Sequence, residues 1–315
     1  MSALAPGRIA RAFEAACRAE LAALKPGNVH VHAAGHGMEV AQFEQAAAAA
    51  APAIARAGAR AGMRIREAVE ASLAVAGCNT NLGIILLCAP LAAAAEAPGP
   101  GDLRVRLAAV LAELDVDDAR DAFCAIAAAS PGGLGDAPEA DVRAPAAITL
   151  AAAMALTADR DRIARQYATV YADIFALGLP ALRTESGDGR AGAPHATAHV
   201  PTGRAPAEPG TETAEPPPAG TACLAPARVE AAYLAFLSAF PDSHIARKFG
   251  PQAAEAVRAE AEAIRTALPA LAPAARHARL MAFDAALKAR GLNPGTSADL
   301  TVASVFAALL EADGA

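Results

Sequence analysis

The stretch CNTNLGIILLCAPLAAAAE, residues 78–96, decides the fold of this chain. It opens with small polar residues and continues after Gly83 as a run with no polar face. A helix that is apolar on every side is buried, and Asn and Thr are favourable residues at the start of one. About 14 apolar residues are too few to cross a bilayer. We therefore expect a buried central helix, which Pro90 should kink or end.

The start of this helix is a candidate binding site. The first turn of a helix carries backbone N–H groups without partners, and in a buried helix they can hold an anion. A cap that merely closes a core helix would need the same residues, so the stretch alone leaves both interpretations open. The side chains and backbone that would meet a ligand here belong to Asn79, Thr80, Asn81 and Gly83.

The composition predicts an all-α fold. Hydrophobic residues make up 55% of the 315 residues, with many alanines, which are the strongest helix formers. Strand-like alternation is short, and VHVH at 29–32 is its clearest case. We predict one large multi-helix domain around the 78–96 helix, formed by residues 1–182 and 223–315. The segment 183–222 is dense in Pro, Gly and Thr and is predicted to be a disordered insertion.

Charge and cysteine content narrow the class of protein. A net charge of −6 without a basic stripe, together with few aromatic residues, argues against nucleic-acid binding. Five cysteines without a CxxC spacing predict small core residues of a reduced, cytoplasmic protein. We expect no membrane span and no signal peptide. The oligomeric state stays open, and a homodimer is one of the options.

The first predicted helix, 7–24, places Glu20 on its apolar side. A carboxylate there is paired, bound to a metal or used chemically, unless it reaches solvent at the edge of the apolar stripe. The sequence KPGN at 25–28 then ends the helix, and the loop that follows carries His30, His32 and His36. Their spacing matches no established metal-ligand pattern, so histidines that hydrogen-bond in a substrate loop are favoured over a zinc site.

Further helices are expected on both sides of the central one. The region 39–70 is rich in alanine and interrupted at Pro52 and Gly62, and the segments 103–129 and 145–177 also read as helical. The arginines of the first region are expected to form a solvated face; they are Arg56, Arg60, Arg64 and Arg66.

The sequence SPGGLGDAPEADV, residues 130–142, is a candidate phosphate loop. Its glycines would let backbone N–H groups approach an anion closely; they are Gly132, Gly133 and Gly135. Asp136 and Asp141 follow, and carboxylates beside such a loop suit a polyphosphate bound with Mg²⁺. A plain glycine-rich turn is the alternative.

The sequence PDSHIARKFGP, residues 241–251, predicts a short helix capped by Asp242 and ended by Gly250. One face of this helix is cationic and carries His244, Arg247 and Lys248. These cations could bind an anionic ligand, or they could simply complement the helix dipole.

The last predicted helix begins in LNPGTSADL, residues 292–300, and carries Asp299 on its apolar face. An unpaired carboxylate on an apolar face is costly, as it is for Glu20. Asp299 also stands three residues after Thr296, so a role in capping the helix is the alternative. We therefore expect these two helices to pack beside the central helix and to bring both carboxylates into one pocket with Asn79 and Asp141.

Together these segments resemble one family, the triphosphoribosyl-dephospho-CoA synthases, which help to make the prosthetic group of citrate and malonate decarboxylases. The resemblance rests on Glu20 followed by KPGNV, the loop ending in His36, GCNTNLG, PGGLG with Asp141, and LNPGTSADL. It covers most of the chain outside 183–222. It implies an all-helical fold and transfer of the triphosphoribosyl group of ATP to the 2′-hydroxyl of 3′-dephospho-CoA, with release of adenine.

The chain departs from the usual family pattern in three places. Asn-Thr-His-Lys-Gly is here NTNLG at 79–83, which lacks the Lys expected to meet phosphate. Ala-His-Lys-Asp-Met is GHGME at 35–39, shorter by one residue, and Asp-Thr-Asn with Arg-Gly-Gly becomes DSH at 242–244 with RKFG at 247–250. The variant resembles the branch associated with tetrahydromethanopterin or methanofuran pathways in methylotrophs and methanogens, so the acceptor stays open.

The resemblance assigns roles to the candidates. Cleavage of the ribose–adenine bond develops positive charge on the sugar, which carboxylates can stabilise. Glu20 is the candidate general base, and the other catalytic candidates are His36 and Asp299. The candidates for substrate binding are Lys25, Asn28, Asn79, Thr80, Asn81, Gly83, Gly132, Gly133, Gly135, His244, Arg247, Lys248 and Asn293. ATP would bring Mg²⁺, whose candidate ligands are Asp136, Asp141 and Asp242.

A non-catalytic helical protein that keeps only the family's fold is the remaining interpretation. Release of adenine from ATP would separate it from the enzymes.

Deleting residues 184–221 and joining the flanks should leave folding and activity nearly intact, because long surface loops add little closure entropy. Thermal unfolding and an activity assay of the shortened chain would check this. A midpoint lowered by about ten degrees or more would mean that the segment packs on the folded protein.

Overall fold

A computed structural model describes residues 2–33, 35, 37–129, 141–183 and 224–313. Fourteen α-helices and no β-strand occur in these ranges, which confirms the prediction of an all-α fold. The VHVH stretch forms no strand: the loop that contains it has only two isolated bridges, His30 with Ala33 and Gly35 with Met38.

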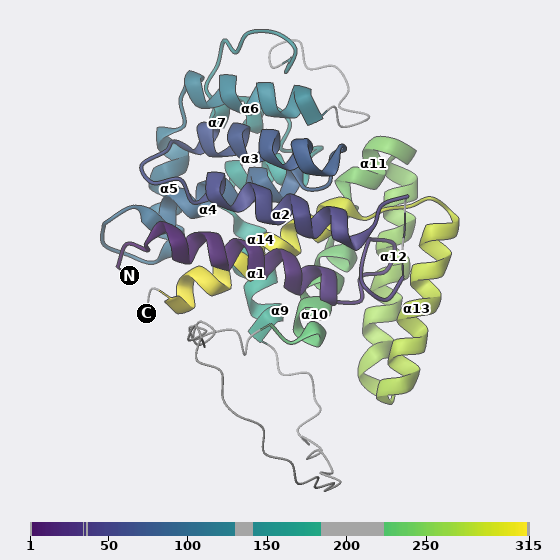
Figure 1. Ribbon diagram of the computed structural model, residues 1–315. Coiled ribbons are helices and arrows are strands. Elements are labelled where there is room, and N and C mark those ends of the chain that lie inside the picture. Colours follow the sequence, from purple (N-terminus) through teal and green to yellow (C-terminus); the bar gives the residue numbers. More distant parts are fainter. Residues whose placement is uncertain (1, 34, 36, 130–140, 184–223, 314–315) are drawn as a thin grey trace, which may run out of the picture.

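The helices follow one another along the chain as Figure 1 shows. They are α1 (Pro6–Ala22), α2 (Val40–Ile54), α3 (Ala61–Ala76), α4 (Leu82–Glu96), α5 (Leu103–Glu113), α6 (Val116–Ala129), α7 (Leu150–Ala155), α8 (Arg162–Ala168), α9 (Leu179–Arg183), α10 (Pro226–Ala239), α11 (Ser243–Phe249), α12 (Pro251–Ala267), α13 (Pro273–Ala289) and α14 (Gly295–Asp313). A π-helical turn, Ile174–Gly178, precedes α9, and a 3-10 turn, Leu268–Ala270, joins α12 to α13.

Helix α4 is the buried central helix that the sequence predicts, and it packs against α3, α5 and α14. The sequence predicts that Pro90 kinks or ends the helix, and the second of these is wrong, because the helix continues to Glu96. Pro90 has no N–H to offer the carbonyl four residues earlier. That carbonyl, on Leu86, instead accepts a hydrogen bond of 2.6 Å from the hydroxyl of Tyr167. The hydroxyl of Tyr171 donates a 3.0 Å hydrogen bond to the next carbonyl, that of Leu87.

Helices α1 and α14 come from opposite ends of the chain and lie side by side (Figure 1). The rings of Phe13 and Phe306 meet edge to face between them, with centroids 5.9 Å apart. Glu20 lies seven residues after Phe13, and Asp299 lies seven residues before Phe306. Because the helices run in opposite directions, the same end of this pair carries both carboxylates.

The alanine-rich region 39–70 is two helices, separated by a loop in which Gly58 has a φ of +66°. Arg64 corrects the expectation of a solvated arginine face, since its side chain is fully buried. It donates 2.7 and 2.9 Å hydrogen bonds to the carbonyls of Ile54 and Ala59 and pairs with Glu96. These bonds satisfy the carbonyl of the last residue of α2, which has no partner within the helix, and a carbonyl in the loop before α3.

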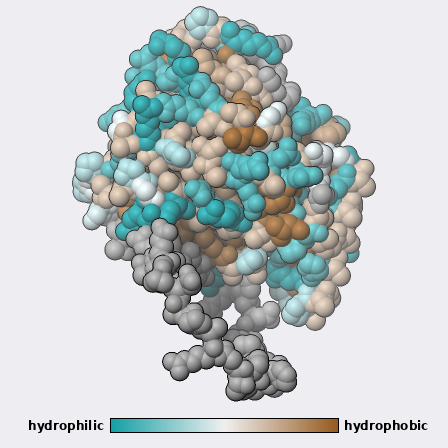
Figure 2. Space-filling model, viewed as in Figure 1, coloured by the Kyte–Doolittle hydropathy of each residue, from teal (hydrophilic) through white to brown (hydrophobic). Residues whose placement is uncertain are grey.

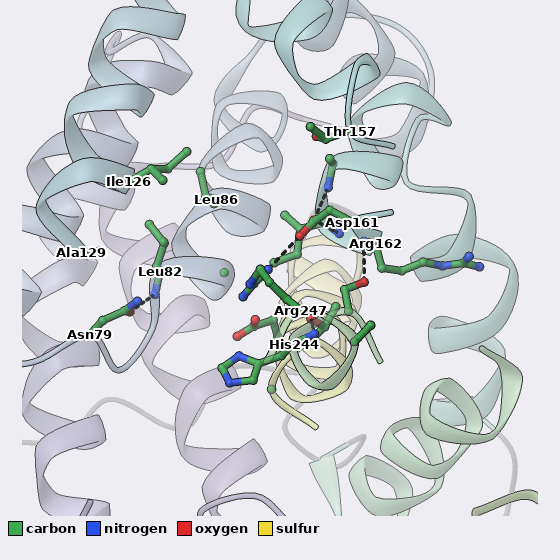
Figure 3. A pocket seen from close by; sticks show the side chains of 18 of the residues that line it. Asn79, Leu82, Leu86, Ile126, Ala129, Thr157, Asp161, Arg162, His244 and Arg247 are labelled. Atoms are coloured by element: carbon green, nitrogen blue, oxygen red, sulfur yellow. Dashed lines mark hydrogen bonds and ion pairs between the residues drawn. The ribbon is translucent and has the colours of Figure 1, made fainter. Parts of the chain in front are cut away.

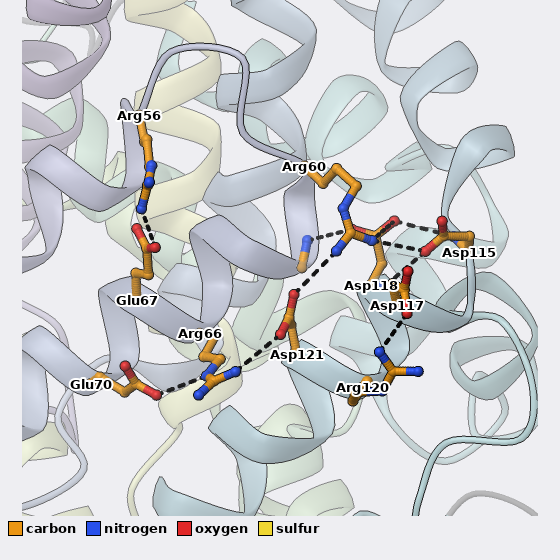
Figure 4. A network of polar contacts seen from close by, with 11 residues as sticks. Arg56, Arg60, Arg66, Glu67, Glu70, Asp115, Asp117, Asp118, Arg120 and Asp121 are labelled. Carbon is orange, nitrogen blue, oxygen red and sulfur yellow. Dashed lines mark hydrogen bonds and ion pairs between the residues drawn. The ribbon is translucent and has the colours of Figure 1, made fainter.

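Other arginines of this region do lie on the surface, in a network of ion pairs between α3 and α6 (Figure 4). Arg60 pairs with Asp115 and Asp121, and Arg66 pairs with Asp121 at 3.4 Å. Such exposed pairs contribute little individually. The buried contact beneath them is closer: Asp118 accepts a 2.7 Å hydrogen bond from the backbone of Gly62.

The segment 145–177 is not the continuous helix that its sequence suggests. It forms the short helices α7 and α8, and α8 begins at a cap where Asp161 accepts hydrogen bonds from two backbone N–H groups. Val170 and Tyr171 then adopt positive φ values of 50° and 54°, which end α8 before the π-helical turn. Of the predicted insertion, Arg183 is the last residue of α9, and the rest lies outside the described residues.

The face seen in Figure 2 mixes hydrophilic and hydrophobic residues without one continuous apolar patch. The large hydrophobic side chains that are exposed in the described part of the chain are Val31, Val75, Val105, Leu156, Phe249 and Leu271. Within the same ranges, the helices are all too short or too polar to cross a membrane.

Replacing Arg64 with Met should lower the free energy of unfolding by about 3–5 kcal/mol, because it leaves the Glu96 carboxylate, a buried carbonyl and a partly buried carbonyl without their partner. Arg56→Met is the matched control. Arg56 belongs to the same region, is 54% exposed and pairs with Glu67, so its loss should cost about 0.5 kcal/mol or less. Urea unfolding of both variants would check the difference, and equal effects would contradict the role given to Arg64.

Candidate active site

One large pocket lies between the start of α4 and the segments that surround it, with a volume of about 1370 Å³. Its walls come from α1, α2, α4, α6, α7, α8, α11, α12 and α14 and from the loops beside them. Figure 3 shows Leu82, Leu86 and Ile126 on one side and Asp161 and Arg247 on the other. Pockets for one small ligand usually measure about 300–1,000 Å³, so this one has room for two nucleotide-sized molecules.

Glu20 lines this pocket from the last turn of α1 and is 4% exposed. Its carboxylate pairs with Lys25, which is fully buried. The ammonium of Lys25 also donates to Asn28 Oδ1 at 2.9 Å and to the carbonyl of Val29 at 2.7 Å. Burial raises the pKa of Glu20, while the Lys25 charge opposes that shift. The pair therefore keeps a carboxylate in an apolar wall.

The structure does not support the predicted contact of Lys25 with a triphosphate. Its side chain lies behind the pocket wall and outside the pocket lining, and burial lowers its pKa against the opposing charge of Glu20. Three acceptors already face the three N–H bonds of its ammonium group. Lys25 thus holds Glu20 and the KPGN loop, and the loop's other predicted residue, Asn28, does line the pocket.

The KPGN loop is fixed from the side of α10 and α13. The hydroxyl of Tyr233 donates to the carbonyl of Pro26 at 2.7 Å, and Asp284 accepts from the N–H of Gly27 at 2.8 Å. Asp284 also pairs with His30, at 3.2 Å, and with Lys288. His30 is therefore a buried structural residue, and the hypothesis that it contacts substrate is not supported. His36 lies outside the described residues.

Asp299 lies in the first turns of α14, half-buried, and lines the same pocket. A Cβ atom added at Gly83 would lie 2.1 Å from its Oδ2, so only glycine at the start of α4 leaves room for this carboxylate. Burial and the nearby carboxylates of Asp242 and Glu20 hold the pKa of Asp299 well above its usual range. With Asn79 and Asp141 also in the lining, the expected meeting of these four residues is confirmed.

The three polar residues before α4 differ in whether they line the pocket. Asn79 lines the pocket and its Oδ1 accepts a 3.2 Å hydrogen bond from the N–H of Leu82, which caps the helix (Figure 3). Thr80 also lines the pocket, and its buried hydroxyl has no partner among the described residues. Asn81 is 5% exposed and lies outside the main pocket. The predicted contact of Asn81 with substrate is therefore not supported.

Helix α11 presents its cationic face to the pocket, as its sequence predicts, through His244, Arg247 and Lys248. Arg247 is held by Asp161, 3.1 Å away (Figure 3). Asp242, a predicted metal ligand, lies outside the lining and is 1% exposed. One of its oxygens caps α11 and the other accepts 2.8 Å hydrogen bonds from the N–H and hydroxyl of Ser297. This full set of donors supports a structural role for Asp242.

Several charged residues of the pocket were not predicted as site residues. They lie at its exposed or partly exposed rim, in and beside short helices: Arg143, Asp159, Arg160, Asp161 and Arg162. The sequence ADRDR at 158–162 could have indicated a charged binding segment, because carboxylates alternate there with arginines. No periodicity could place them, since the segment is a turn that leads into α8.

The geometry described above can now be compared with known proteins. The family model CitG, ATP:dephospho-CoA triphosphoribosyl transferase, matches residues 6–200 and 224–315. The chain belongs to this family. Membership makes it a transferase, and the two stretches of the match contain all the pocket residues described here.

A crystal structure of a candidate triphosphoribosyl-dephospho-CoA synthase from Archaeoglobus fulgidus has the same fold. The two proteins superpose with a TM-score of 0.58 at 23% sequence identity, over 85% of this chain and 98% of that one. No curated protein sequence matches the chain.

Whether the residues of the pocket fit a divalent cation depends on the ligands that they can offer. In the described part of the chain, no group of three His, Cys, Asp or Glu side chains is arranged to hold a metal ion. Mg²⁺ usually binds through one or two carboxylates together with substrate phosphates and water. Asp141 and Asp159 at the rim fit that requirement, whereas Asp136 and the three glycines of the candidate phosphate loop lie outside the described residues.

Gly83→Ala should lower activity by about 100-fold, because the new methyl group would displace the Asp299 carboxylate. Its effect on stability should be small, since overpacking against Ile163 is offset by the higher helix propensity of alanine. Gly7→Ala in α1 is the control, because its Cβ would meet only Arg11, at 3.7 Å. Steady-state kinetics and melting curves of both variants would check this. Full activity of Gly83→Ala would contradict the close approach.

Proposed function

We propose that the pocket transfers the triphosphoribosyl group of ATP to the 2′-hydroxyl of 3′-dephospho-CoA, and that Glu20 and Asp299 carry out the proton transfers. The observation that supports this is that Glu20 and Asp299, two carboxyl groups of raised pKa, both line the floor of a pocket whose rim is cationic. Carboxylates that flank a glycosidic bond are the usual catalytic groups for its cleavage.

Glu20 is the proposed general base. Its pairing with Lys25 favours the ionised form, while burial raises the pKa and makes the carboxylate a stronger base than one in water. It would take the proton of the acceptor's 2′-hydroxyl as that oxygen bonds to C1′ of the ribose.

Asp299 is the proposed general acid. Its raised pKa keeps the carboxyl protonated at a pH where an ordinary aspartate is ionised. As the bond between C1′ and N9 breaks, the bonding electrons leave with adenine, which takes the proton of Asp299. The proton removed by Glu20 balances the one given by Asp299, so the net products are triphosphoribosyl-dephospho-CoA and adenine.

The triphosphate is proposed to lie at the rim, where most of the pocket's cations are. The cations that line it are Arg143, Arg160, Arg162, Arg247 and Lys248. The ion pair with Asp161 already positions one of them, Arg247, which lowers the entropy cost of ordering that side chain on binding. Mg²⁺ held by Asp141 and Asp159 would neutralise further phosphate charge.

One difference from the family pattern, at the start of α4, supports an alternative acceptor substrate. Leu82 lines the pocket where the usual family pattern has a Lys. A pocket with this change would suit another anionic acceptor, such as an intermediate of tetrahydromethanopterin or methanofuran synthesis. Incubation with ATP, Mg²⁺ and each acceptor, followed by mass spectrometry, separates the two. Absence of adenine release with every acceptor would favour a binding protein.

Glu20→Gln should abolish turnover, with a loss of about 10²–10⁴-fold or more, while preserving the helical content. The amide cannot accept the hydroxyl proton, yet it keeps the shape of the side chain. Glu14→Gln is the control on the same helix, because Glu14 is partly exposed and pairs only with Arg18 on the surface. Adenine release and circular dichroism would test both. Normal turnover by Glu20→Gln would rule out its role as the base.

The pH profile of kcat/KM should be bell-shaped. Activity falls at low pH as Glu20, whose pKa is raised, becomes protonated, and falls at high pH as Asp299 loses its proton above its own raised pKa. Asp299→Asn should lower kcat by about 10²-fold or more and remove the fall at high pH. A fall at high pH that persists unchanged in Asp299→Asn would show that another group is the acid.

A further inference from the structure

A second, much smaller cavity lies behind Glu20, between α1, α2 and the start of α4. Its volume of about 10 Å³ is enough for one water molecule. Its walls are Cys17, Glu20, Leu21, Phe43, Ala47, Asn81 and Ile84. Glu20, Phe43 and Ile84 line both the large pocket and this cavity, and Glu20 is the charged residue of the three.

The polar groups of the cavity are incompletely paired. Asn81 receives a 2.6 Å hydrogen bond at Oδ1 from the hydroxyl of Ser72, which fixes the orientation of its carboxamide. The Nδ2 group is buried and has no partner among the described residues. A buried donor without a partner costs about 1–3 kcal/mol, and such groups are usually satisfied by an ordered water.

Glu20 supplies the matching acceptor. The hydrogen bond from Lys25 falls on Oε1, so Oε2 is available to accept from another donor. Cys17, the remaining polar wall residue, contributes a neutral thiol, because burial and the neighbouring Glu20 charge raise its pKa. A water between Asn81 and Glu20 would receive one hydrogen bond and donate another.

We propose that this cavity holds one ordered water molecule that links Asn81 Nδ2 to the Glu20 carboxylate, so that Asn81 is a positioning residue for the general base. This inference rests on the proposed role of Glu20. Ser72, Asn81 and the water then form a chain of hydrogen bonds that reaches Glu20 through the small cavity. Lys25 fixes one carboxylate oxygen and the water fixes the other.

The chain has a chemical consequence. Hydrogen bonds donated to a carboxylate favour its charged form. The water therefore helps to keep Glu20 ionised and aimed at the acceptor hydroxyl, although Asn81 itself lies outside the main pocket.

The first test is a ligand-free crystal structure at a resolution that shows buried waters. We expect density for one water in the cavity of the wild-type protein. In Asn81→Gln, the longer carboxamide should fill the space of the water and donate to Glu20 directly. An empty cavity in the wild type would overturn the proposal. This readout needs no turnover, so it stands even if the acceptor or the reaction is different.

The second test is the ¹³C NMR titration of the Glu20 carboxyl, identified by its absence in Glu20→Gln. Asn81→Leu should raise the pKa of Glu20 by about one unit, because a donor to the charged form is lost. Asn81→Gln should restore the wild-type value. Ser72→Ala should shift it in the same direction as Asn81→Leu and serves if that variant does not fold. Ser238→Ala is the control, since the hydroxyl of Ser238 donates to the carbonyl of Ala235 within α10. Unchanged titration in Asn81→Leu and Ser72→Ala would refute the link.

Discussion

The buried ion pair between Glu20 and Lys25 is the interaction on which the site depends. Two charges taken out of water are costly unless each of their remaining hydrogen-bonding positions is also filled. Here Lys25 reaches Asn28 and Val29 as well, so that one ammonium group joins the end of α1 to the loop that follows it. The loop in turn is held by Asp284, at Gly27. Glu20 is therefore fixed by residues from both ends of the chain, and none of them has to move for it to face the pocket.

The central helix imposes the second constraint. A helix as apolar as α4 can be buried because its backbone groups bond to one another, but Pro90 breaks that pattern in the middle of the core. The hydroxyl of Tyr167 replaces the lost donor at the carbonyl of Leu86, and the hydroxyl of Tyr171 bonds to the next carbonyl, that of Leu87. Both tyrosines belong to the segment that also carries Asp161 to the pocket rim. The hydrogen bonds from these tyrosines to α4 thus also anchor the segment that carries Asp161, which forms one wall of the pocket.

The sequence was sufficient to predict what depends on local pattern. Glu20 and Asp299 stood out because each is a carboxylate on an apolar helix face, and the structure brings them into one pocket. Arg64 was misjudged because an arginine that bonds to the end of α2, to the loop after it and to the end of α4 has no signature in its own helix. Asp242 could be recognised as a cap, but its second set of partners, on Ser297, lies far away in the sequence. Residues of that kind need the tertiary structure.

The distribution of charge within the pocket connects these constraints to the chemistry. The chain as a whole is acidic, with a net charge of −6, yet the pocket rim gathers arginines, among them Arg160 and Arg247, while the floor holds the buried Glu20 and the half-buried Asp299. Cations at the rim can attract a triphosphate and remain partly hydrated, at little desolvation cost. In the floor, burial disfavours the charged form of a carboxyl group and thereby raises the pKa of Glu20 and Asp299. The positive charge that develops on the ribose during transfer would therefore lie in the part of the pocket where a negative charge stabilises it most.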